Sequence, residues 1–182
     1  MQTVSKIRKE IKIVNTVSTA TLGQKVNIAS FNKYKHLSTD LDLYRCGYVK
    51  DDKMTGRVTI FGNGKMISVG TKSSKDSFQE LENSKKIMQK YKLINSCKLD
   101  PQVRNIVATV DFARPLHIES LARTIPKSMY EPEQFPGLIH RIRDSIVSLI
   151  FASGKVVIVG SKSFEDLNYA YFHLNQFFDK MK

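Results

Sequence analysis

The hydrophobic and polar positions of this chain recur at a fixed spacing. Residues Ile60–Ser73 read IFGNGKMISVGTKS and residues Ile150–Ser163 read IFASGKVVIVGSKS, so eight of fourteen positions are identical at an offset of 150 − 60 = 90 residues. Each copy predicts an apolar strand, a tight glycine-containing turn and a second strand. The same offset relates Asn15–Thr19 to Asn105–Thr109. The chain is therefore predicted to be a tandem repeat of one unit.

Further elements are expected around these hairpins. The pattern predicts strands at 13–22, 44–50 and 138–143, short helices at 26–31 and 116–123, and a loop at 34–42. Ser73 and Ser163 begin capping boxes with Asp in place of Glu, so a helix should follow each hairpin. Apolar stripes at helical spacing should pack these helices on the sheet: Phe78, Leu81, Met88 and Tyr91, then Leu167, Ala170, Tyr171, Leu174, Phe178 and Met181. The expected organisation is a polar tail at 1–12 and repeats at 13–94 and 95–182.

The hairpin strands are apolar on both faces. In the second copy, alternation places Ile150, Val156 and Ile158 on one face and Leu149, Phe151, Val157 and Val159 on the other. About two helices per repeat can cover one face, which leaves a large apolar patch. A monomer rarely exposes such a patch without a partner. A sandwich or a dimer that hides both faces is the alternative to a ligand-binding surface.

Charge adds a candidate partner. The net charge is +12; residues 1–94 carry 18 − 8 = +10 and residues 95–182 carry 11 − 9 = +2. This balance favours a polyanion, with nucleic acid ahead of a membrane surface, although solubility alone is an alternative explanation. The two repeats are expected to have different partners. Cys46 and Cys97 have no metal-ligand spacing, which indicates reduced thiols in an intracellular compartment.

No catalytic, metal or cofactor site is predicted. The four histidines, at 36, 117, 140 and 173, are scattered and lack metal spacing. Gly62-Asn63-Gly64 is a lone G-x-G inside a hairpin, which is not a phosphate loop. No Ser/His/Asp or Cys/His set is present to argue for nucleophilic catalysis. The start of the chain has no signal-peptide pattern, and its longest apolar run is too short to span a membrane.

The segment Ser128–Arg141, SMYEPEQFPGLIHR, closely resembles the second-repeat signature of the TATA-box-binding protein family. The two hairpins with Ile-Phe-x-x-Gly-Lys and the two Asn-x-Val strands resemble the same family, so the resemblance covers roughly residues 13–182. It implies an α+β fold: a saddle-shaped ten-stranded antiparallel sheet with four helices on the convex face and pseudo-twofold repeats. The concave face of this family lies in the DNA minor groove, and the family has no enzymatic activity.

The resemblance also implies a set of DNA-binding residues. Asn15 and Asn105 match paired asparagines that donate to groove acceptors, and Phe61, Phe135 and Phe151 match intercalating wedges. The fourth wedge matches Tyr44, with Leu43 as the alternative. The remaining matched contacts are apolar at Val17, Ile67, Val69, Val107, Leu149, Val157 and Val159, polar at Thr59, and basic at Lys65, Lys72, Arg141, Lys155 and Lys162. Thr59 stands where the family usually has Leu, and Val69 and Val159 stand where it has a pair of central Thr residues.

The implied function is a general transcription initiation factor that binds and bends A·T-rich promoter DNA and nucleates the preinitiation complex. Tyr130, Glu131 and Glu133 match the surface that recruits transcription factor IIB, although Gln134 replaces a usual leucine. Lys85, Lys86 and Lys90 match a region that meets transcription factor IIA and TBP-associated factors. The two Thr losses keep an alternative open, a protein-interaction platform with relaxed DNA specificity. A homodimer of the free protein also stays open. The expected location is the nucleus of a eukaryotic cell, or a viral factory or the cytoplasm for a virus.

Overall fold

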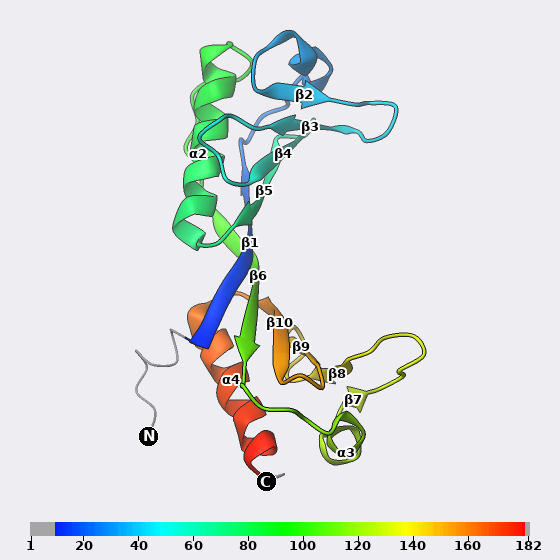
Figure 1. Cartoon of the computed structure of the whole chain (residues 1–182). Helices are drawn as coiled ribbons and strands as arrows, with labels where there is room; N and C mark the ends of the chain where they lie inside the picture. Colours follow the sequence, from blue (N-terminus) through cyan, green and yellow to red (C-terminus); the bar gives the residue numbers. More distant parts are fainter. Residues whose placement is uncertain (1–9, 181–182) are drawn as a thin grey trace. The chain divides into compact units, whose positions relative to one another are not determined.

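The computed structural model describes residues 10–180 and divides them into two compact units. Residues 15–104 form the first-repeat unit, and residues 10–14 and 105–180 form the second-repeat unit. The strand order is β2-β3-β4-β5-β1 in the first-repeat unit and β6-β10-β9-β8-β7 in the second-repeat unit (Figure 1). The predicted α+β class, with a ten-stranded antiparallel sheet, four helices and two repeats, is confirmed. The predictions for the tail at 1–9 and for Met181 lie outside the described residues.

The first-repeat unit contains the larger part of β1 (Ile11–Thr21) and six further elements. They are η1 (Ile28–Lys33), β2 (Leu37–Thr39), β3 (Cys46–Val49), β4 (Arg57–Phe61), β5 (Lys65–Thr71) and α2 (Ser74–Lys90). The predicted hairpin is β4–β5, with Thr59 opposite Ile67 and Arg57 opposite Val69. β5 also pairs with β1, where Thr19 lies opposite Ile67. The predicted capping box begins α2, because Ser73 Oγ accepts the Asp76 N–H at 3.0 Å.

The second-repeat unit repeats this plan. It contains most of β6 (Gln102–Asp111), then α3 (Ile118–Thr124), β7 (Ser128–Met129), β8 (Leu138–Arg141), β9 (Val147–Ile150), β10 (Lys155–Ser161) and α4 (Phe164–Asp179). The predicted hairpin is β9–β10, with Val157 opposite Leu149. Ser163 Oγ caps α4 by accepting the Asp166 N–H at 3.1 Å. Both long helices thus begin at the capping serines predicted from the sequence, Ser73 and Ser163.

Several predicted elements differ in the structure; the strand predicted at 138–143 ends at Arg141, and the helix predicted at 116–123 spans Ile118–Thr124. The loop predicted at 34–42 was wrong, because Leu37–Thr39 forms β2, a short edge strand paired with β3. The helix predicted at 26–31 is a 3₁₀ helix shifted to Ile28–Lys33. The strand predicted at 44–50 is limited to Cys46–Val49, since Tyr44 bonds back to Asp40 in the preceding turn. β1 starts at Ile11, two residues before its predicted start.

The helices cover one face of the sheet in each unit, as the alternation predicted. Leu81 and Met88 of α2 and Leu167, Leu174 and Phe178 of α4 are fully or almost fully buried. The strand residues beneath them, such as Ile60 and Met66 or Ile150 and Val156, are likewise inaccessible to solvent. Burial of this apolar area is the main favourable term in folding. The other face keeps its half-exposed apolar side chains, and it is the candidate binding surface.

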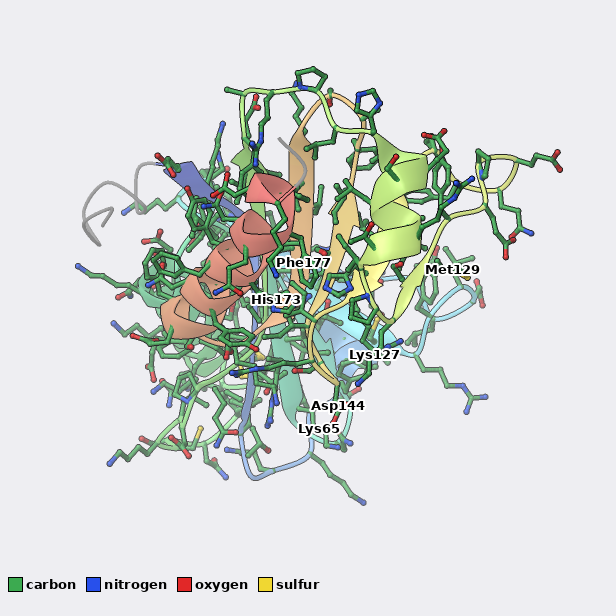
Figure 2. All side chains as sticks on the ribbon, turned by 90° about the horizontal axis from the view of Figure 1, so that it is seen from below. Lys65, Lys127, Met129, Asp144, His173 and Phe177 are labelled. Carbon is green, nitrogen blue, oxygen red and sulfur yellow. The ribbon has the colours of Figure 1, made fainter. Side chains whose placement is uncertain are left out.

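A histidine pair joins α4 to β8 within the second-repeat unit. His140 on β8 is 2% exposed, and its Nε2 lies 3.1 Å from Nε2 of His173. Phe177 lies one turn beyond His173 on α4 (Figure 2). Its ring packs edge-on against both imidazoles. Burial first, and then the charge of His173, lower the pKa of His140 against an opposing effect of the Lys127 backbone. Burial also lowers the pKa of His173.

This pair predicts a loss of stability in mild acid. Both imidazoles have lower pKa values in the folded chain than the usual 6.5, so the unfolded chain binds more protons below that pH. The stabilisation is therefore complete above about pH 6.5 and is lost as the pH falls toward the folded-state values. Thermal unfolding midpoints measured between pH 7.5 and 5 should fall, and His140→Phe should flatten that slope. His117→Gln, which changes an exposed imidazole, is the control, and equal slopes in all three proteins would contradict the assignment.

Candidate nucleic-acid interface

The strand face opposite the helices is called the open face here. In the first-repeat unit it includes Val17, Thr19, Thr59, Phe61, Ile67 and Val69, and in the second-repeat unit Val107, Thr109, Leu149, Phe151, Val157 and Val159. All twelve side chains are half-buried, whereas their strand neighbours on the helix side, apart from Gly70 and Gly160, are buried. Each unit therefore presents a broad apolar surface made by strands rather than by loops. A rigid sheet of this kind holds its side chains in fixed positions.

Each unit positions one asparagine on the open face by means of a β-bulge. The register of β1 on β5 shifts between Thr16 and Ser18, and that of β10 on β6 shifts between Ile158 and Ser161. Gly70 and Gly160 lie at these bulges with φ of +96° and +86°. A Cβ at Gly160 would lie 1.6 Å from the Ser145 carbonyl oxygen, so glycine is required there. The bulge removes the glycine N–H from the regular ladder.

The asparagine side chains accept these freed N–H groups. The Gly70 N–H donates to Asn15 Oδ1 at 2.8 Å, and the Gly160 N–H donates to Asn105 Oδ1 at the same distance. Only the amide oxygen can accept such a bond, so the contact fixes which end of each amide is free. The Nδ2 group of each asparagine is left as a donor. The family resemblance matched Asn15 and Asn105 to a pair of donors. The backbone bond to Oδ1 holds each side chain so that its Nδ2 group can donate.

Two phenylalanines form a supported pair in the second-repeat unit. The rings of Phe135, from the β7–β8 loop, and Phe151, from the end of β9, meet edge to face with centroids 5.8 Å apart. Gly137 provides the room for them, because a Cβ there would lie 2.8 Å from Phe135 and 3.1 Å from Phe151. Both rings are half-buried. The structure therefore brings together two of the residues predicted to act as wedges.

The first-repeat counterpart of this pair is different. The Tyr44 N–H bonds to the Asp40 carbonyl just as the Phe135 N–H bonds to Glu131, both at 2.9 Å, so Tyr44 rather than Leu43 occupies the position of Phe135. Cys46 stands where the other repeat has Gly137, and Tyr44 is 58% exposed. The Cys46 side chain, and secondly burial, raise the pKa of the adjacent Tyr48 phenol. The wedge role of Tyr44 stays a prediction.

Basic side chains accompany the apolar surface. Lys65, Lys72, Lys155 and Lys162 are exposed at the ends of β5 and β10. Arg141 Nη1 donates to the Asp144 carbonyl at 3.1 Å, so this predicted phosphate contact is partly engaged in its own loop. Its counterpart Lys50 donates to the carbonyls of Thr55 and Gly56 at 2.9 and 2.6 Å. The lysines are therefore the freer candidates for phosphate.

The sequence candidates omitted two arginines that the structure places on or beside the open face. The Arg57 guanidinium carbon lies 4.5 Å from the centroid of the Tyr48 ring. Arg104 Nε donates to Thr19 Oγ1 at 2.9 Å. A comparison of the repeats at the 90-residue offset could have singled them out, because their counterparts Val147 and Val14 are uncharged.

The predicted partner surfaces lie on a loop and a helix. Glu131 and Glu133 are exposed in the β7–β8 loop, and Tyr130 beside them is half-buried. On α2, Lys86 and Lys90 are exposed, whereas Lys85 pairs with Glu82 at 2.6 Å. Within residues 10–180, no group of three or more His, Cys, Asp or Glu side chains is placed to hold a metal ion. No helix in that range is long and apolar enough to cross a bilayer.

Comparison with known proteins gives a consistent result. The family model described as "Transcription factor TFIID (or TATA-binding protein, TBP)" matches residues 10–91 and 100–181. A TATA-box-binding protein of Cenarchaeum symbiosum is 41% identical over 92% of this chain and 93% of its own. That of Methanothermobacter thermautotrophicus is 33% identical over 86% and 88%. The solved structure of Methanococcus jannaschii TBP matches with a TM-score of 0.83 and 28% identity, covering 94% of this chain and 99% of its own. The chain belongs to the TATA-box-binding protein family, whose members are non-enzymatic transcription initiation factors.

Proposed function

We propose that this protein binds A·T-rich promoter DNA through the minor groove, bends it, and nucleates assembly of an initiation complex. The observation that carries the proposal is the repeated open face. In each unit, half-buried aliphatic side chains surround an asparagine whose donor end is free, and exposed lysines lie at the strand ends. A surface that is apolar at its centre and cationic at its edges suits a groove floor between two phosphate backbones.

The chemistry of the open face favours A·T pairs. The minor groove presents only acceptors at A·T pairs, whereas G·C pairs add the guanine amino donor. The amides of Asn15 and Asn105 can donate to the acceptors. Aliphatic residues such as Val107 and Val157 offer nothing to a guanine amino group, which would be buried without a partner at a free-energy penalty. Selection thus acts by penalty as well as by attraction.

Bending is supported by the aromatic residues at the strand ends. An aromatic ring inserted between base steps replaces stacking and kinks the duplex; this family is itself the standard example of that behaviour. Phe135 and Phe151 present two adjacent rings in the second repeat. Phe61 and Tyr44 occupy the matching positions of the first repeat.

The test of this function compares base pairs that differ only in one groove. Inosine·cytosine presents the minor-groove acceptors of A·T but lacks the amino group of G·C. The protein should bind an A·T-rich duplex and its inosine·cytosine version with similar affinity, and the G·C version much more weakly. Equal weakening by inosine and guanine would show that the minor groove is not the surface that is read.

A partner of the transcription factor IIB type is proposed to bind the β7–β8 loop. Glu131 and Glu133 are exposed there and carry like charges two residues apart. Glu131→Arg with Glu133→Arg should block formation of the ternary complex on a gel and leave binary DNA binding nearly unchanged, because neither side chain lies on the open face. Glu165→Arg, an exposed acidic residue of α4, is the charge control. A normal ternary complex with both loop changes would remove the role from this loop.

The alternative, an interaction platform with relaxed sequence specificity, is favoured by Val69 and Val159. Each is half-buried on the open face one residue before a bulge glycine. Threonine at either site could place a hydroxyl against a groove acceptor, worth about 1 kcal/mol if well paired. Val69→Thr with Val159→Thr should sharpen the preference for particular central base pairs in a binding profile across sequence variants. Coincident profiles would show that these positions do not read the groove and would support the platform.

A further inference from the structure

The open face of the first repeat carries a stacked arginine. Arg57, Thr59 and Phe61 alternate along β4 with the buried Val58 and Ile60, so Arg57 lies on the open face. Its guanidinium packs over the ring of Tyr48, 4.5 Å from the centroid, and the arginine is exposed. Stacking on an aromatic ring orients the planar guanidinium and leaves its N–H edge free to donate. The positive charge of Arg57 therefore faces outward and is not paired with a carboxylate within residues 10–180.

A second arginine, Arg104, lies beside Phe61, the first-repeat residue matched to an intercalating wedge. Arg104 Nε donates to Thr19 Oγ1 at 2.9 Å, and Thr19 is opposite Ile67 on the open face. Together with Phe61, Lys65 and Ile67, Arg104 lines a hollow of about 450 Å³. The bond occupies only Nε, so the two terminal nitrogens of the guanidinium keep their donor hydrogens.

The second repeat has no counterpart of either group. At the 90-residue offset, 57 + 90 = 147 and 104 − 90 = 14, which are Val147 and Val14. The stacking partner Tyr48, opposite Thr59, is replaced by Ile139, opposite Leu149. Lys50 and Arg141 do not offset the difference, because both are bonded to carbonyls of their own loops. The first-repeat face thus has two guanidinium groups on or beside it, whereas the matching positions of the second repeat are aliphatic and the cation lining its corresponding hollow is Lys12, in the place of Gln102.

We infer that Arg57 and Arg104 are specificity-determining contacts that make the first repeat the stricter reader of A·T pairs. The inference rests on the proposed minor-groove function. A guanidinium can only donate, so it gains from the acceptors of A·T pairs and is opposed by the guanine amino group. The second repeat, with Val147 and Val14, loses no such bond when guanine is present. A single G·C pair in one half of a site should therefore orient the protein with its second repeat on that half.

Orientation can be measured by fluorescence transfer. A donor dye is attached at Lys53→Cys, in the exposed β3–β4 loop, with Cys97→Ser to remove the more accessible native thiol; Cys46 is buried. The acceptor is placed at either end of an otherwise palindromic A·T duplex carrying one G·C pair in one half. We expect one orientation to exceed the other about tenfold, equivalent to about 1.4 kcal/mol. Replacing G·C by inosine·cytosine should return the ratio to about one, because the amino group is absent.

Substitutions distinguish the effect of the two arginines from the effect of positive charge in general. Arg57→Gln with Arg104→Gln should reduce the ratio to below about twofold, since uncharged amides replace the charged donors. Lys33→Gln with Lys75→Gln removes the same charge from exposed helical positions and should leave the ratio unchanged. Ile139→Tyr with Val147→Arg installs the stacked pair in the second repeat and should also move the ratio toward one.

The outcomes are distinct for the inference and for the function beneath it. If the labelled wild type does not bind the A·T duplex, the proposed function fails. If it binds without a preferred orientation, or if the arginine variant keeps the wild-type ratio, only the inference is overturned. The slope of log affinity against log salt concentration falls by roughly 0.9 for each phosphate contact that is lost. If the arginine variant lowers this slope but leaves the orientation ratio unchanged, the arginines anchor phosphates, and the inference is also overturned.

Discussion

Replacing Phe135 and Phe151 together by alanine is expected to weaken binding to A·T-rich DNA by roughly 100-fold and to reduce the bend angle. Stacking of a base on an aromatic ring contributes about 1–3 kcal/mol per base, so the loss of two rings accounts for an effect of this size. Without the rings, an unstacked base step has no filler, and the kinked duplex loses its support. Fluorescence transfer between dyes at the two DNA ends measures the bend in the same titration.

The single variants should not be additive. The two rings meet edge to face at 5.8 Å, so each one orients the other. Phe135→Ala leaves Phe151 without its neighbour, and a double-mutant cycle should give a coupling energy of about 0.5–1.5 kcal/mol. Phe172→Ala removes an aromatic side chain that is 46% exposed on α4, and it should change neither affinity nor bend. Wild-type bend angles in both single variants would exclude the wedge role.

The faces of the sheet could be predicted because strand periodicity is a local property. Alternation placed Ile60 and Ile150 beneath the helices and Phe61 and Phe151 on the opposite face, and burial agrees at all four positions. The starts of the two long helices could be predicted because Ser73 and Ser163 are N-cap residues that lie next to the helices in sequence. The repeat at 90 residues then extended each prediction from one half to the other.

The short edge elements could not be predicted from the pattern. β2 contains three residues, Leu37–Thr39, and only Leu37 is buried, so there is too little alternation to detect. Its stability comes from pairing with β3 and from Asn32, which bonds both the N–H and the carbonyl of Thr39. These are tertiary contacts, and they override weak local preference.

Most residues of the candidate site could be predicted from the sequence, but the contacts that orient them could not. The asparagines were found by resemblance, yet the reason that their Nδ2 groups are free is a bulge at a glycine 55 residues away. A bulge depends on pairing with a distant strand, which a local pattern does not contain. The arginines were missed for a related cause. Arg57 and Arg104 become informative only when Tyr48 and Thr19 are seen beside them.

The asparagines allow a nearly isosteric test of the proposed groove contacts. Asn105→Asp keeps an oxygen that can accept the Gly160 N–H at the position now occupied by Oδ1, 2.8 Å away. The bulge should therefore persist, and the thermal unfolding midpoint should change little. The free end of the side chain, however, changes from a donor into a charged acceptor. Asn15→Asp makes the same change at the Gly70 bulge.

Each of these two substitutions is expected to lower affinity for A·T-rich DNA on the order of 100-fold, because a carboxylate then faces groove acceptors and adjacent phosphates, and such like-charge contacts cost several kcal/mol. The matched control is Asn83→Asp on α2, where Oδ1 accepts from Gln79 Nε2 at 2.9 Å, so an equal charge is added without loss of the accepted bond. Titrations at two salt concentrations separate the local effect from net charge, since screening weakens the general repulsion shared with the control. If Asn105→Asp binds as well as Asn83→Asp, the amide of Asn105 does not face the groove, and the minor-groove assignment loses its central donor.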